Sequence, residues 1–410
     1  MNAEIIAIGS ELLTPQRVDT DSLYLTDQLN GLGIEVTCKT IVGDDRERLA
    51  SAVRLAVSRS EIVLMTGGLG PTEDDVTRDA VAQALGRKLV YHPEVTQEIE
   101  QRFARAGRRM AEINKRQAFI LEGGIVLPND RGTAPGQWIE HGQVSVLLLP
   151  GPPGELQAMF ERQCLPRLQQ KAPTQVIRSV CFRVAGMGES DVDQLIAPVY
   201  TKYTNPATTI LAGAGDIQVQ LRARCATEQE ALALLTEVGT PIEALLGDRI
   251  YSRSGEPIEV MVGSMLRVSQ STLAVAESMT GGELAARVTS VPGSSAYFLG
   301  GFLTYTNAMK AALLGVDRDL LATHGAVSKE TAEAMASGAR ARTGATYAVS
   351  ITGAAGPDSS EDKPLGTTYI GVAGPNGSEV THRQFLGDRS RIRAFAAQLA
   401  LDLLRRRLRA

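Results

Sequence analysis

The sequence predicts an α/β protein of three domains, and three observations lead to this prediction. A chain of 410 residues is longer than one hydrophobic core usually supports. Short apolar strands alternate with helical patterns near both ends of the chain, which is typical of parallel-sheet domains. Charge and proline interrupt the pattern near residues 171–173 and 252–257. We therefore expect domains at 1–170, 175–252 and 257–410.

The first domain opens with three strands separated by two helices. Apolar and β-branched runs predict strands at 4–8, 34–41 and 62–65, and helical spacing predicts helices at 21–32 and 46–58. Two glycine-rich loops, at 66–77 and 150–155, each follow a strand. Successive strand-helix units of this kind form a parallel sheet whose ligand site lies at the carboxyl ends of the strands.

The second domain is predicted to be a small α+β module, and the third is again α/β. In the second, strands at 177–185 and 217–223 are expected to alternate with helices at 189–200 and 228–246. In the third, we expect strands at 273–276, 346–351, 368–372 and 379–385, with helices at 258–268, 282–288, 307–314, 329–343 and from about 389.

Composition narrows the classes of partner. Hydrophobic residues make up 43% and charged residues 21%, which is ordinary for a soluble globular protein, and the net charge of -4 gives no reason to expect nucleic acid or a membrane. The start of the chain lacks the basic and apolar regions of a signal peptide. The four cysteines are scattered without metal-ligand spacing, so we expect reduced thiols in a cytoplasmic protein.

Serine, glycine and lysine residues suggest hydrolytic chemistry in the third domain. Ser278 follows a predicted strand and precedes a glycine-rich helix start, and Ser295 lies in a Gly-Ser-Ser turn, so both are candidate nucleophiles. Lys310 could serve as the base if its amine were neutral. The alternative is that such residues only form turns and helix caps, with a solvated lysine, and composition and spacing alone favour it.

Residues 257–405 resemble the C-terminal domain of the CinA family, the nicotinamide-mononucleotide deamidases. The resemblance is carried by ordered motifs that run through the whole domain: Glu277-Ser278-Met279-Thr280-Gly281-Gly282, Pro292-Gly293-Ser294-Ser295, Phe302-Leu303-Thr304-Tyr305-Thr306-Asn307-Ala308-Met309-Lys310, His324-Gly325-Ala326-Val327-Ser328, Thr352-Gly353-Ala354-Ala355-Gly356-Pro357-Asp358, Lys363-Pro364-Leu365-Gly366-Thr367 and Gly387-Asp388-Arg389. The family pattern has cysteine at Met279, serine at Thr306 and Thr352, and often glycines at Ser359-Ser360. None of these departures removes a proposed catalytic group.

This resemblance implies hydrolysis of the carboxamide of nicotinamide mononucleotide to nicotinic acid mononucleotide and ammonia, with no cofactor. It implies Ser295 as the nucleophile, Lys310 as its base and Tyr305 as a hydrogen-bonding helper. The implied substrate-binding residues are Ser278, Thr280, Gly281, Gly282, Thr352, Gly353 and Arg389, the last as a phosphate or substrate contact. His324 is expected to be a structural loop residue.

The loop at 66–77 suggests a phosphate site in the first domain. Its glycines let the backbone approach a phosphate, and its carboxylates could hold a divalent cation, whereas the alternative is that the acids only cap a helix. Residues 1–168 resemble the CinA N-terminal domain, of the molybdopterin-binding fold, through Gly9-Ser10-Glu11-Leu12-Leu13, Val42-Gly43-Asp44-Asp45, the loop at 66–77 and Pro150-Gly151-Pro152-Pro153-Gly154-Glu155.

That second resemblance implies hydrolysis of ADP-ribose to AMP and ribose 5-phosphate with a divalent metal (Mg, Mn or Co). The implied nucleotide-binding residues are Gly67, Gly68, Gly70 and Gly151, and the implied metal ligands are Asp44, Glu73, Asp74 and Asp75. One departure stands out, because Asp21 occupies a position that commonly carries asparagine. An added carboxylate there could alter nucleotide or metal affinity.

The middle segment resembles a KH-type module, but it lacks the GXXG loop with basic flanks that a nucleic-acid-binding KH domain needs. Instead, acidic residues follow Gly186-Met187-Gly188. We therefore expect a spacer or dimer contact, a homodimer, and no direct binding to nucleic acid. Two alternatives stay open: a competence or DNA-repair binding protein, or a molybdopterin-binding protein.

Overall fold

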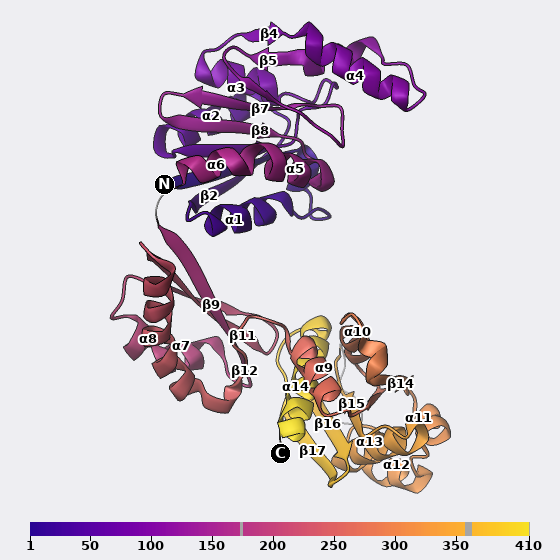
Figure 1. Cartoon of the computed structure of the whole chain (residues 1–410). Coiled ribbons are helices and arrows are strands. Elements are labelled where there is room, and N and C mark those ends of the chain that lie inside the picture. Colours follow the sequence, from indigo (N-terminus) through magenta and orange to yellow (C-terminus); the bar gives the residue numbers. More distant parts are fainter. Residues whose placement is uncertain (173–174, 357–362, 410) are drawn as a thin grey trace. The chain divides into compact units, whose positions relative to one another are not determined.

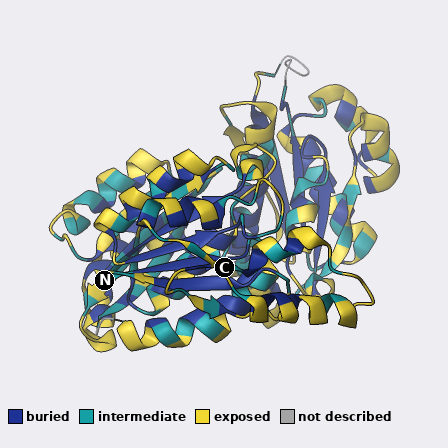
Figure 2. Ribbon diagram, turned by 90° about the horizontal axis from the view of Figure 1, so that it is seen from above, coloured by how far each residue is buried: buried dark blue, intermediate teal, exposed yellow. Residues whose placement is uncertain are grey.

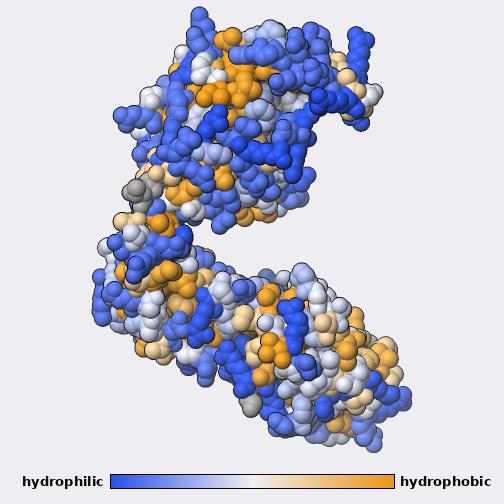
Figure 3. Space-filling view, viewed as in Figure 1, coloured by the Kyte–Doolittle hydropathy of each residue, from blue (hydrophilic) through white to orange (hydrophobic). Residues whose placement is uncertain are grey.

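A computed structural model describes residues 1–172, 175–356 and 363–409. The chain divides into two compact units: residues 1–178 with 224–231, and residues 179–223 with 232–410 (Figure 1). The central strands of the six-stranded and five-stranded sheets are buried beneath helices whose outer faces are exposed (Figure 2). The face seen in Figure 3 is mostly hydrophilic. No described helix is both long and apolar enough to cross a membrane.

The first unit contains a six-stranded sheet in the order β2-β1-β3-β8-β7-β6. The four strands β1 (Asn2–Ile8), β2 (Glu35–Val42), β3 (Ile62–Thr66) and β8 (Val144–Leu149) are parallel, whereas β7 (Gly136–His141) and β6 (Ile125–Leu127) pair antiparallel at the other side. The predicted parallel α/β arrangement is confirmed. The three predicted opening strands are present with shifts of one or two residues at their ends.

Helices cover both faces of this sheet because alternate strand residues point to opposite sides. Ile6 and Val63 pack with α2 (Arg46–Arg59) and α3 (Thr77–Leu85), whereas Ile5 and Leu64 pack with α1 (Asp21–Gly31), α5 (Pro153–Met159), the π-helical turn η3 (Phe160–Cys164) and α6 (Leu165–Lys171). The short pair β4 (Leu89–Tyr91) and β5 (Phe119–Leu121), with α4 (Pro93–Arg105), extends the domain.

The middle module has four strands in the order β10-β11-β9-β12. Its strands are β9 (Val176–Ala185), β10 (Ala207–Ala212), β11 (Asp216–Cys225) and β12 (Ile250–Ser252), and its helices are α7 (Glu189–Tyr200) and α8 (Glu228–Leu246). The predicted α+β class is confirmed. Strands β10 and β12 were not predicted, because the first is mostly solvent-exposed and the second spans three residues.

The last domain contains a five-stranded sheet in the order β14-β13-β15-β16-β17. The parallel strands are β14 (Phe298–Leu303), β13 (Leu273–Glu277) and β15 (Tyr347–Gly353), and β16 (Thr367–Gly374) and β17 (Gly377–Gln384) continue antiparallel. The helices are α9 (Ile258–Val268), α10 (Glu283–Thr289), α11 (Asn307–Leu314), α12 (Arg318–His324), α13 (Lys329–Thr343) and α14 (Arg389–Arg409).

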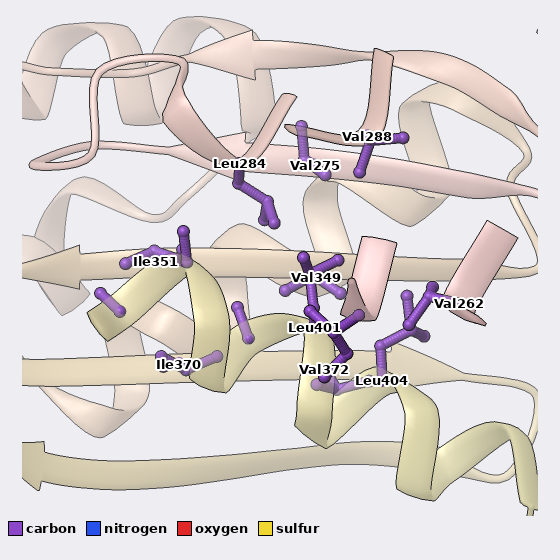
Figure 4. Close-up of a cluster of buried hydrophobic side chains, with 14 of the residues drawn as sticks. Val262, Val275, Leu284, Val288, Val349, Ile351, Ile370, Val372, Leu401 and Leu404 are labelled. Atoms are coloured by element: carbon purple, nitrogen blue, oxygen red, sulfur yellow. The ribbon is translucent and has the colours of Figure 1, made fainter. Parts of the chain in front are cut away.

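The core of this domain lies between the sheet and helices α9, α10 and α14. Figure 4 shows Val275, Val349 and Val372 from three neighbouring strands facing Leu401 and Leu404 of α14. A second apolar layer, on the other sheet face, includes Ala274, Leu314 and Met335, which come from β13, α11 and α13. The two layers hold the carboxyl ends of β13, β14 and β15 in fixed register.

Candidate active sites

The carboxyl ends of three parallel strands bring separate motifs to one edge of the last domain. In the middle strand, Glu277 pairs with Leu303 on one side and with Ile351 on the other. The pairing continues past the strand ends, since the N-H of Ser278 donates to the Ile351 carbonyl at 3.0 Å and that of Thr304 to the Glu277 carbonyl at 2.8 Å. Ser278, Thr304 and Thr352 therefore meet at one sheet edge.

Lys310 reaches this edge from α11 and contacts Ser278. Its side chain is 1% exposed, and its Nζ donates to the Oγ of Ser278 at 3.2 Å and to the carbonyl of Thr304 at 3.0 Å. The helix begins at this point because the Thr306 side chain accepts a hydrogen bond from the Met309 N-H at 3.3 Å. A hydroxyl and an amine are thus buried together within hydrogen-bond distance, which is the arrangement a serine nucleophile needs.

Ser295 was predicted to lie beside Lys310, but the structure places Ser278 there. Ser295 lies in the exposed turn η5 (Ser294–Ala296), before β14 begins. The register pairs Leu273 with Phe298 at the start of the strands and Glu277 with Leu303 at their ends. Five strand steps of about 3.3 Å separate the two edges by roughly 17 Å. Ser295 is at the amino edge, and the serine beside Lys310 is Ser278.

Glu277 organises the turn that carries Ser278. Its carboxylate is buried and accepts hydrogen bonds from the N-H groups of Gly282 at 3.1 Å, Leu284 at 3.0 Å and Ala285 at 2.8 Å, so it caps α10. Sequence reasoning missed this role. A carboxylate directly before a serine and a glycine-rich helix start was the available signal.

The glycine amides of this turn are used by the protein itself, so the substrate-binding role that the resemblance implies for Gly281 and Gly282 stays a prediction. The Gly281 N-H donates to the Ser278 carbonyl at 3.1 Å, and the Gly282 N-H donates to Glu277. Both glycines have positive φ, +62° and +96°. In contrast, within the described residues the N-H groups of Met279 and Thr280 have no hydrogen-bond acceptor. The Thr280 hydroxyl is also buried without a partner there.

Tyr305 and Arg389 form a polar pair beside this turn. An Arg389 nitrogen donates to the Tyr305 hydroxyl at 3.1 Å, and another donates to the Gly356 carbonyl at 2.6 Å. The Tyr305 carbonyl lies 3.5 Å from the Lys310 amine, which links the pair to the buried site. Both side chains are exposed, so they can meet a substrate from solvent.

The remaining predicted residues of this domain have other surroundings. The Thr352 hydroxyl donates to the Ala326 carbonyl at 2.6 Å, and Gly353 ends β15. His324 ends α12 with its ring 3.7 Å from the Glu330 carboxylate. Pro357, Asp358 and Ser359-Ser360 lie outside the described residues.

A cavity of about 640 Å³ in the first unit is lined by all four predicted glycines, Gly67, Gly68, Gly70 and Gly151. Gly67 has φ +98°, and a Cβ there would lie 2.3 Å from the Ile8 carbonyl oxygen, so only glycine fits. The buried guanidinium of Arg78 donates to the carbonyls of Leu69 at 2.6 Å and Gly70 at 2.7 Å. Sequence reasoning missed Arg78, which fixes the loop backbone.

The four predicted metal ligands do not form one cluster. Asp75 accepts from the N-H groups of Gly70 at 2.7 Å and Thr72 at 2.8 Å, so it shapes the loop. Glu73 instead pairs with Arg116 at 2.6 Å, which lowers its pKa, and it is not among the residues that line the cavity. Asp44 and Asp74 line the cavity. Within the described residues, no three His, Cys, Asp or Glu side chains come together to hold a metal ion.

Comparisons with known proteins match the chain along its whole length. Family models match at residues 4–170 (probable molybdopterin binding domain), 179–252 (damage-inducible protein CinA KH domain) and 255–408 (CinA C-terminal domain). A CinA-like protein of Solibacter usitatus is 67% identical over 409 residues, covering 100% of this chain and 98% of that protein. A CinA-like protein of Koribacter versatilis is 48% identical over 413 residues, covering 100% of both chains. A solved structure of a CinA superfamily protein from Klebsiella pneumoniae is 31% identical and covers 37% of this chain and 96% of its own, with a TM-score of 0.37.

Proposed function

The chain belongs to the CinA family, and from this premise we propose that its C-terminal domain is an amidase that hydrolyses nicotinamide mononucleotide. The products are nicotinic acid mononucleotide and ammonia. The observation that carries this proposal is the 3.2 Å contact between Lys310 and Ser278 at the carboxyl edge of the sheet. Ser278 therefore takes the nucleophile's role that the motif resemblance had given to Ser295.

In the acylation step, the Ser278 hydroxyl oxygen attacks the carboxamide carbon, and its proton moves to the Lys310 amine. Removing an amine from water favours its uncharged form, which is the form that accepts this proton. The carboxamide oxygen becomes an oxyanion, and the N-H groups of Met279 and Thr280 are the donors proposed to receive it. When the C-N bond breaks, Lys310 returns the proton to the leaving group, which departs as ammonia.

In the second step, water hydrolyses the ester on Ser278. Lys310 takes a proton from the water, the resulting hydroxide attacks the acyl carbon, and the bond from that carbon to the serine oxygen breaks. The proton on Lys310 then returns to the Ser278 oxygen, and the product is released as a carboxylic acid, which loses its proton to water and becomes a carboxylate. No step needs a metal. Arg389, held beside Tyr305, is proposed to bind the substrate phosphate.

Ammonia release tests this proposal directly. The full chain is incubated with nicotinamide mononucleotide in the presence of a chelator, and nicotinic acid mononucleotide is measured alongside ammonia. Equal amounts of both products are expected. No product at any enzyme concentration would reject the proposal. Measuring a thermal shift with a pterin in parallel tests the alternative of a molybdopterin-binding protein.

A second activity is proposed for the first unit, namely hydrolysis of ADP-ribose to AMP and ribose 5-phosphate with a divalent metal. The glycine-lined cavity supports it, because a backbone without side chains can approach a pyrophosphate closely. The carboxylates do not supply a complete metal site, so we derive no step through a metal. The test is the full chain with ADP-ribose and Mg²⁺, Mn²⁺ or Co²⁺ in turn. No AMP with any of them would reject the activity.

A further inference from the structure

The cavity of the first unit is strongly acidic. Arg17 is the basic residue among those that line it. The acidic residues that line it are Glu11, Asp19, Asp21, Asp44, Asp74, Asp75 and Glu155. An anionic pyrophosphate is not attracted by such a surface. The carboxylates can be neutralised by other parts of the protein, by the divalent metal of the proposed activity or by donor groups of the ligand.

Several of these carboxylates have partners within the protein. Asp75 accepts from loop N-H groups, Asp44 accepts from the Ser10 N-H at 2.8 Å, and Glu155 accepts from the Asn129 side chain at 2.8 Å. Asp19 accepts from the Ser22 N-H at 2.9 Å at the start of α1. These bonds satisfy both oxygens of Asp75 and one oxygen of each of the other three groups, and they hold the rim of the cavity.

Asp21 differs from them. It is the first residue of α1 and is only 7% exposed, yet its Oδ1 is buried with no hydrogen-bond partner among the described residues. A buried acceptor without a donor is costly. Asp21 lines a ligand-sized cavity, and because the protein itself covers Oδ1, a ligand in that cavity meets the carboxylate at its other oxygen. Burial and the neighbouring Asp19 carboxylate raise the pKa of Asp21 to about 6.

We propose that Asp21 is a specificity-determining residue that accepts a hydrogen bond from a ribose hydroxyl of the nucleotide bound in this cavity. This inference rests on the nucleotide-binding function proposed for the first unit. A phosphate cannot be the partner, because it offers no donor and repels a carboxylate. A ribose hydroxyl is a donor, and a carboxylate that binds ribose next to a glycine-rich phosphate loop is a known solution in nucleotide sites.

The affinity of this cavity for its nucleotide should depend on pH. A donor from the ligand favours the ionised carboxylate, so affinity is full above about pH 7 and falls as the pH drops through about 6. The other charged groups that face the cavity come from five parts of the fold. They are Glu11 in η1 (Ser10–Leu13), Arg17 and Asp19 in the loop after η1, Asp44 after β2, Asp74 and Asp75 after β3, and Glu155 in α5. No histidine is among the described residues that line it. ADP-ribose is a pyrophosphate diester and has no phosphate proton that titrates in this range.

The experiment measures ADP-ribose binding to the full chain by calorimetry, from pH 5 to pH 8. For Asp21→Ala we expect a dissociation constant at pH 8 raised about tenfold or more. For Asp21→Asn we expect loss of the pH dependence between 5 and 7. Asp27→Ala is the matched control, because Asp27 is an exposed acid of the same helix and does not line the cavity. It should bind as the wild type does.

A second ligand identifies the donor. Inosine diphosphate ribose lacks the exocyclic amine of adenine but keeps both riboses. Asp21→Ala should lower the affinity for this ligand by the same factor as the affinity for ADP-ribose. If Asp21→Ala binds this ligand as tightly as the wild type does, the assignment of a ribose hydroxyl as the donor is overturned. If Asp21→Ala binds ADP-ribose with unchanged affinity, the inference alone fails. If the wild type does not bind ADP-ribose, the proposed function of the first unit fails with it.

Discussion

The Nζ of Lys310 lies 3.2 Å from the Oγ of Ser278, and the two side chains are buried at the carboxyl edge of the C-terminal sheet. The residues are 32 positions apart in sequence. They meet because β13 and β14 are parallel neighbours in register, so the turn after each strand arrives at the same edge. The sheet register, more than any local motif, decides which serine lies beside Lys310.

Arg389 is expected to contribute to binding of the substrate phosphate and little to the chemical step. Arg389→Ala should raise the KM for nicotinamide mononucleotide about tenfold or more and change kcat by much less, since a charged hydrogen bond is worth about 1.5–3 kcal/mol. Nicotinamide riboside, which lacks the phosphate, should be hydrolysed equally by wild type and variant. Arg391→Ala, an exposed arginine of the same helix, serves as the control. A kcat defect with an unchanged KM would contradict the assignment.

Glu277 is expected to support both stability and activity. Glu277→Ala leaves three N-H groups at the start of α10 without their acceptor, so we predict a loss of about 1–3 kcal/mol in the free energy of unfolding. The rate of ammonia release should also fall, because the same turn positions Ser278. Urea unfolding and steady-state rates measure the two effects. Glu283→Ala, a partly exposed acid on the same helix, should change both much less.

Asp402 holds a buried charge pair in α14. Its carboxylate accepts from Arg405 at 2.9 Å and from Arg406 at 2.9 Å, and Arg405 also donates to the Asp248 carbonyl at 3.0 Å. Asp402→Ala leaves the buried Arg405 guanidinium uncompensated, so we predict destabilisation of about 3–5 kcal/mol. Arg406→Ala removes the half-exposed partner and should cost about 0–1 kcal/mol. Similar unfolding midpoints for these two variants would contradict this account.

Asp21 is expected to make the first unit less stable at neutral pH. Its pKa is raised from 3.8 to about 6 on folding, so the folded state binds the proton more tightly than the unfolded state. The free energy of unfolding therefore falls as the pH rises from about 4 to about 6, and stays lower above that. Asp21→Asn should unfold at a higher urea concentration than wild type at pH 8 and at nearly the same concentration at pH 4. A variant less stable than wild type at pH 8 would show that the carboxylate has a partner.

The sequence was sufficient to predict the α/β class of the first and last parts of the chain and the α+β class of the middle module. The roles predicted for the glycine loop of the first unit and for Lys310 stay predictions. The sequence was not sufficient to choose between Ser278 and Ser295. Glycine is rare in strands, so Gly300-Gly301 in the middle of β14 makes this strand hard to predict from the sequence. Without β14, the register that places Ser278 and Ser295 at opposite edges of the sheet cannot be inferred. The partners of two carboxylates in the 66–77 loop could not be predicted for a related reason, because only the folded loop directs Asp75 to backbone amides and Glu73 to Arg116.

The central claim is that Ser278, paired with Lys310, carries out amide hydrolysis. It is tested most directly by ammonia release from nicotinamide mononucleotide with wild type, Ser278→Ala, Lys310→Met and Ser295→Ala, each checked for folding by circular dichroism. We predict that Ser278→Ala and Lys310→Met lose activity by about a thousandfold or more, whereas Ser295→Ala stays within about threefold of wild type. Near-normal turnover in Ser278→Ala, or its loss only in Ser295→Ala, would contradict the account.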